Sequence, residues 1–82
     1  MNHDATTIQR GLLSFIARKG GSMPMRQLHT YSLVMYQAGH QAFSEVMEAL
    51  VDGAYVTFNN AEATFYLTDK GRQVVDEVKP TT

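Results

Sequence analysis

Two short runs of alternating aromatic and β-branched residues, separated by a polar loop, constrain the fold of this chain most. Residues 55–58 read YVTF and residues 64–67 read TFYL. Residues of these types favour pleated, half-buried strands. The loop between them, NNAEA, begins with Asn59-Asn60, a pair that suits a turn requiring positive φ. The sequence therefore predicts a β-hairpin over residues 54–67.

Three segments before the hairpin and one after it repeat apolar residues at the spacing of an amphipathic helix. The predicted helices cover residues 6–19, 25–37, 40–52 and a last segment capped by Thr68. Asp4 or Thr6 supplies the oxygen that caps the first helix, and Gly20-Gly21 ends it. The SMPM run at residues 22–25 contains a proline, which favours extended backbone before it. We expect there a short edge strand or an extended entry into the next helix.

The segment over residues 25–37 is the least regular of the four. Its apolar residues, Leu33 and Val34 included, go most of the way round a helix, which is typical of a helix buried on more than one side. Its YSLVMY run also fits a buried strand. We interpret the segment as a helix because Ala38-Gly39-His40 then forms a compact break.

At 82 residues the chain is predicted to form one domain, over residues 4–79, followed by a disordered tail at 80–82. It has no cysteine, so disulfides and thiolate metal sites are excluded, and we expect a reducing, cytoplasmic location. No apolar stretch is long enough to predict a membrane span. The predicted core consists of Leu12, Phe15, Ile16, Leu28, Phe43, Met47, Leu50, Val56, Phe65, Leu67, Val74 and Val78.

The predicted order places two helices joined by a short turn directly before the hairpin, as in a helix-turn-helix with a wing. The segment VMEALVDGAYVTF…FYLTDKGRQVVDEV resembles winged helix-turn-helix transcriptional regulators of the MarR and PadR type. The matching positions are Leu50, Gly53, Tyr66, Leu67, Thr68 and Gly71, and the resemblance covers residues 40–78. It implies a mostly helical α+β fold, with the order helix, short strand, two helices, two strands and helix.

The resemblance also implies a dimeric DNA-binding regulator that reads double-stranded DNA with helix 40–52 and the wing at 54–67. The positions that face the DNA major groove would be Gln41, Ser44, Glu45 and Glu48, beside His40. Asn59, Asn60 and Glu62 would lie at the wing tip. Phosphate contacts would come from Arg26, Lys70 and Arg72. We expect a homodimer because a two-fold dimer doubles the contact that one small module offers.

The distribution of charge departs from this family pattern. From Gln27 to Asp69 the chain carries no Lys or Arg, whereas Glu45, Glu48 and Asp52 lie on the exposed side of the third helix. Phosphate binding requires cations, so this surface has the wrong sign for DNA. The alternative is a protein-interaction module whose acidic third-helix face docks on a basic protein partner. A further alternative is an accessory protein that occupies the DNA-binding surface of another regulator.

The sequence gives no indication of an enzyme or of a bound cofactor. It contains no glycine-rich phosphate loop and no nucleophile elbow. His3, His29 and His40 lie far apart, without acidic or thiolate partners at ligand spacing, so we expect no metal site. The four tyrosines have no interleaved Lys or Arg and are interpreted as core or interface residues rather than base-stacking platforms.

Overall fold

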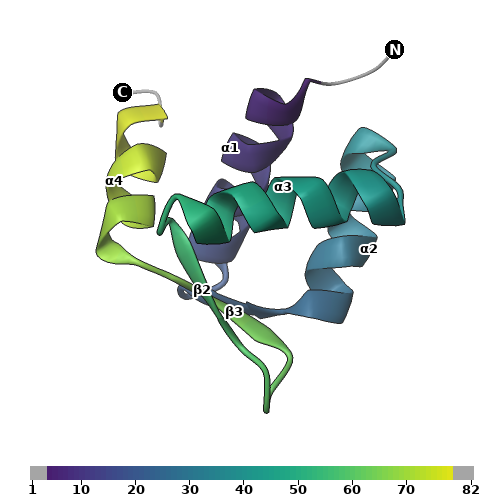
Figure 1. Cartoon of the computed structure of the whole chain (residues 1–82). Coiled ribbons are helices and arrows are strands. Elements are labelled where there is room, and N and C mark those ends of the chain that lie inside the picture. Colours follow the sequence, from purple (N-terminus) through teal and green to yellow (C-terminus); the bar gives the residue numbers. More distant parts are fainter. Residues whose placement is uncertain (1–3, 79–82) are drawn as a thin grey trace.

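The structure, a computed structural model, describes residues 4–78 and contains four helices and three strands in that range. The elements are α1 (Ala5–Arg18), β1 (Ser22–Pro24), α2 (Met25–Tyr36), α3 (His40–Asp52), β2 (Val56–Asn59), β3 (Thr64–Leu67) and α4 (Asp69–Val78). In Figure 1, α3 crosses over α1, with α4 on one side and α2 on the other. The hairpin of β2 and β3 projects away from the helices. The fold is therefore mostly helical α+β, in the order that the sequence predicts.

The strands form one antiparallel sheet in the order β1-β3-β2. Met23 of β1 and Phe58 of β2 lie on either side of Phe65 of β3, and the two phenylalanine ring centroids are 4.7 Å apart. Met23 and Phe65 are buried, whereas Thr57 and Tyr66 are exposed. One face of the small sheet thus covers the helices. Of the two interpretations of residues 22–25, the edge strand is confirmed.

The predicted helix ends are confirmed where side chains or glycines supply the missing hydrogen bonds. Asp4 accepts a hydrogen bond from the Thr7 N–H at 2.7 Å and so caps α1. Gly20 and Gly21 follow that helix with φ angles of 94° and 99°, a region that favours glycine. Thr68 accepts from the Gly71 N–H at 3.0 Å at the start of α4.

Gly71 is needed for space as well as for its N–H. It is buried, and a Cβ atom at this position would collide with the Tyr55 carbonyl and with the Leu67 side chain. The Thr68 hydroxyl donates to the Ala54 carbonyl at 2.7 Å and to the Tyr55 carbonyl at 2.9 Å. The LTDKG run therefore joins the end of the hairpin to the start of α4 by close backbone contact.

The turn of the hairpin differs from the prediction. Neither Asn59 nor Asn60 has positive φ; the left-handed residue is Ala63, with a φ of 52°. Asn59 instead accepts a hydrogen bond from the Glu62 N–H at 3.0 Å, so its side chain closes a longer loop. The hairpin is confirmed, but the role assigned to the asparagine pair is wrong.

The core lies between α1, α3 and the inner face of the sheet. Eight of the twelve predicted residues are buried: Leu12, Ile16, Leu28, Phe43, Met47, Leu50, Val56 and Phe65. Phe15, Leu67 and Val74 are partly buried and pack against the core. The side chain of Val78 lies outside the part of the chain that the structure describes. Leu13, Met23 and Ala38 are buried although the predicted core omits them.

The predicted helix over residues 25–37 is confirmed as α2, but it is buried on one side only, so the predicted burial on more than one side is wrong. Leu33, Val34 and Met35 are 49%, 67% and 49% exposed. The buried positions of α2 are Leu28 and Ser32, and the Ser32 hydroxyl donates to the His29 carbonyl at 2.9 Å. The YSLVMY run is helical and not a strand.

Candidate interaction surface

The outer face of α3 carries the acidic side chains that the sequence places there. Gln41, Ser44, Glu45, Glu48 and Asp52 are all exposed. The Gln41 amide donates to the Glu45 carboxylate at 3.3 Å across one turn of the helix. Because neither α3 nor the hairpin contains a Lys or Arg, this face is negatively charged.

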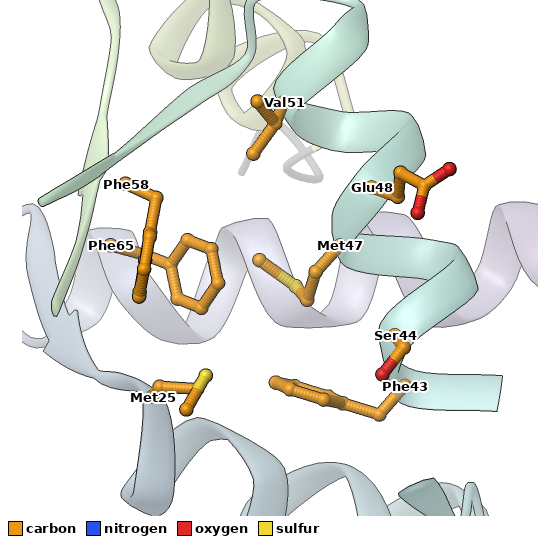
Figure 2. Close-up of a pocket in the computed structure, with 8 residues that line it drawn as sticks. All are labelled: Met25, Phe43, Ser44, Met47, Glu48, Val51, Phe58 and Phe65. Atoms are coloured by element: carbon orange, nitrogen blue, oxygen red, sulfur yellow. The ribbon is translucent and has the colours of Figure 1, made fainter. Parts of the chain in front are cut away.

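An apolar groove lies beside this face, between α3, the start of α2 and the hairpin (Figure 2). It has a volume of about 330 Å³ and is lined by Met25, Phe43, Ser44, Met47, Glu48, Val51, Phe58 and Phe65. Figure 2 shows the hairpin phenylalanines and Met25 on one side, facing Phe43 and Met47 on the other. Met25 and Val51 are 41% and 40% exposed. The groove thus offers apolar area to a partner, with Glu48 at its rim.

A second hollow of about 240 Å³ adjoins this groove at the start of α3. It shares Met25, Phe43 and Ser44 with the groove and adds Arg26, His29 and His40. The His29 ring is edge-on to Phe43, with centroids 5.0 Å apart, and lies 5.9 Å from the His40 ring. The His29 Nε2 atom is buried and has no hydrogen-bond partner among the described residues. The structure therefore brings Arg26 and His40 together, as part of one surface with Ser44.

The tip of the hairpin is held by its own hydrogen bonds. Asn59 and Asn60 are exposed, and the Asn59 side chain is engaged with the Glu62 N–H. The Tyr66 hydroxyl donates to the Glu62 carboxylate. This hydrogen bond, together with desolvation and the charge of Glu62, raises the pKa of Tyr66 above its usual 10.0. The tip therefore presents an acidic residue and an amide, and no cation.

Lys70 and Arg72 do not line the groove or its adjoining hollow. Lys70 donates through Nζ to the Gly53 carbonyl at 2.7 Å and lies 4.6 Å from the Tyr55 ring centroid. The Arg72 guanidinium packs on Gly21, with Nη2 2.5 Å from the place that a Cβ atom would occupy there. Both cations contact backbone of their own chain. Of the three predicted phosphate contacts, only Arg26 lines the hollow at the start of α3.

Met25, Val51 and Phe58 line the groove, although no sequence pattern singles them out as a site. Val51 is an apolar residue of the helix predicted over residues 40–52, and Phe58 ends the YVTF run of the predicted hairpin. A signal for the groove is present, since Phe43, Met47 and Val51 recur at every fourth position and so share one face of α3. The opposite wall of the groove depends on where the hairpin and α2 pack, and the spacing along α3 does not reveal this.

Comparisons with protein-family models, with curated proteins and with solved structures give no match. Among the side chains that the structure describes, no group of three or more His, Asp or Glu residues is placed to hold a metal ion. None of the helices described is long and apolar enough to cross a membrane.

Proposed function

We propose that this chain is a winged helix-turn-helix domain that acts as a protein-interaction module through α3 and the adjoining groove. The single observation that carries this proposal is an exposed apolar groove directly beside an acidic helix face. The order of elements, with a hairpin following two helices joined by a short turn, supports the winged-helix part.

Protein binding fits this surface better than DNA binding on energetic grounds. Burial of apolar area is the main favourable term in protein association, at about 25 cal/mol per Å². Met25, Val51 and Phe58 supply such area, and aromatic and Met side chains are enriched in interface cores. DNA offers mainly phosphates to such a surface, and the carboxylates of Glu45 and Glu48 repel them. A basic protein surface would be attracted by the same carboxylates.

The second candidate function is a dimeric DNA-binding transcriptional regulator. Arg26 is exposed at the start of α2, and His40 lies beside it at the start of α3. Helix N-termini favour anions, so this corner suits a phosphate group. Gln41 and Ser44 on the same helix are exposed and have side chains able to bond base edges. These observations favour contact at one end of α3 only.

We also propose that the chain self-associates, through the exposed side of α2. Leu33, Val34 and Met35 form an apolar patch there. From Gln27 to Ser44 the sequence has no Asp, Glu, Lys or Arg, so two copies of this patch would meet without charge repulsion. A two-fold arrangement would place the same residues opposite each other.

A gel-shift titration of the whole chain with the DNA that flanks its own gene, at low and moderate salt, separates the two functions. We expect no salt-sensitive binding at micromolar protein. If DNA binding weakens with salt, and the slope of log affinity against log salt falls by about one in Arg26→Ala, the DNA-binding regulator becomes the favoured function. Arg72→Ala is the matched control, because that guanidinium packs on Gly21 and should leave the slope unchanged.

A further inference from the structure

We infer that the partner of this surface is an amphipathic helix that carries a basic residue at one end of its apolar stripe and an acidic residue at the other. This inference rests on the proposed protein-binding function and adds the chemistry of the partner. It follows from the length of the apolar surface and from the charges at its two ends.

The groove and the adjoining hollow form one trough, because both are lined by Met25, Phe43 and Ser44. The trough follows α3 from His40 to Val51. At 1.5 Å per residue this stretch is about 16 Å long, which equals about three turns of a helix. A helix lying there would present apolar side chains at positions i, i+4 and i+7, the usual anchors of a helix bound in a groove.

The lining also favours a helix over an added strand. Its apolar members are side chains of Met, Phe and Val, and methionine adapts to the shape of an inserted side chain. Such a surface binds projecting side chains, whereas an added strand is recognised through main-chain hydrogen bonds.

The two ends of the trough carry opposite charge. Glu48 lines the groove near the end of α3, with its carboxylate pointing away from the hairpin (Figure 2), and Asp52 follows it one turn later on α3. Arg26 stands at the other end, where α3 begins. There Gly39 is the N-cap without a side-chain hydrogen bond, and the first turn of α3 has no acidic residue, so the positive end of the helix dipole adds to Arg26. A Lys or Arg of the partner therefore lies beside Glu48, and an Asp or Glu lies beside Arg26.

The test is selection of peptides of about 12–16 residues from a random displayed library on the immobilised whole chain. Selected peptides are synthesised and their affinities measured by fluorescence anisotropy for wild type, Val51→Asp and Thr57→Asp. Val51 is 40% exposed in the groove, and Thr57 is exposed on β2, outside the trough. We expect the selected peptides to carry apolar residues at helical spacing flanked by opposite charges. Their binding should be about tenfold weaker or more in Val51→Asp and unchanged in Thr57→Asp. Circular dichroism shows whether both variants are folded.

Charge exchange tests the orientation. Glu48→Lys should weaken the selected peptides, and replacing the peptide's basic residue by Glu should restore binding to that variant. Two results would overturn the inference and leave the protein-binding function standing. One is that peptides whose binding depends on the groove have alternating, strand-like patterns. The other is that Glu48→Lys and Arg26→Glu do not change the affinity of peptides with charged ends. Peptides that bind Val51→Asp and wild type equally would overturn both.

Discussion

Lys70 of α4 donates through its Nζ atom to the carbonyl oxygen of Gly53, the residue that follows α3, at 2.7 Å. The same ammonium group lies 4.6 Å from the centre of the Tyr55 ring. The last carbonyls of a helix have no partner within the helix and carry partial negative charge, so a cation at this place stabilises the helix end. Lys70 thus links α4 to the end of α3, which gives it a structural role.

We expect Lys70→Met to lower the free energy of unfolding by about 0.5–1.5 kcal/mol, since it removes a charged hydrogen bond and a cation–π contact. Urea denaturation of the whole chain measures the change. Arg26→Met is the control, because that side chain is exposed at the trough, and its effect should stay within about 0.5 kcal/mol. Equal losses in the two variants would contradict the structural role of Lys70.

Gly11 lies against the hydroxyl end of the Tyr36 side chain, where a Cβ atom would overlap the tyrosine oxygen. Glycine inside a helix normally lowers stability by about 1 kcal/mol relative to alanine. Here we expect the reverse: Gly11→Ala should destabilise by about 1–3 kcal/mol, because the close-packed ring must move. Thermal unfolding measures it. Gly39→Ala, which meets no atom within 4 Å, is the control and should change stability by less than about 1 kcal/mol.

Leu50 is 1% exposed at the centre of the core. Leu50→Ala should lower the free energy of unfolding by about 2–5 kcal/mol through lost burial and the cavity left behind. Leu33→Ala removes the same atoms from a side chain that is 49% exposed and should cost less than about 1 kcal/mol. Chemical denaturation of both variants gives the comparison, and similar losses would mean that the packing of α3 is not as described.

Two tyrosines should titrate above the usual range. Burial, followed by the neighbouring Tyr31, raises the pKa of Tyr36, and the hydrogen bond to Glu62 raises that of Tyr66, both above 10.0. A raised pKa means that the folded state holds the tyrosine proton more tightly than the unfolded state does. The resulting contribution to folding stability is complete below pH 10.0 and is lost as the pH rises through the pKa values of the folded state. Tyrosinate absorbance in the folded and urea-unfolded chain should show this shift. It should shrink in Tyr36→Phe and in Tyr66→Phe, and unchanged curves would contradict the contacts.

The apolar patch on α2 predicts the oligomeric state. If Leu33, Val34 and Met35 form the contact between two copies, Val34→Glu should place like charges opposite each other and dissociate the dimer. Light scattering after size exclusion measures the mass of wild type and variant. A monomeric wild type, or a Val34→Glu dimer as stable as wild type, would reject this contact. Val51→Glu in the groove is the matched control and should leave the mass unchanged.

The sequence by itself determined the elements and most of the core. Alternating residues at 55–58 and 64–67 gave the hairpin, and the short polar or glycine residues at Asp4, Gly20-Gly21 and Thr68 gave the helix ends. These signals are local: a cap, a left-handed glycine or a period of two acts within a few residues of the chain. The acidic face of α3 follows in the same way from helical spacing.

Only the tertiary structure decided which apolar and charged residues face solvent. Leu33, Val34 and Val51 have the side chains of core residues, yet they are 49%, 67% and 40% exposed. Lys70 has the side chain of a solvated cation, but the packing of α4 brings it to Gly53. The apolar trough exists because the hairpin and the start of α2 stop short of covering α3. Such contacts join residues far apart in sequence, and their free energy depends on the relative placement of whole elements, which no local pattern encodes.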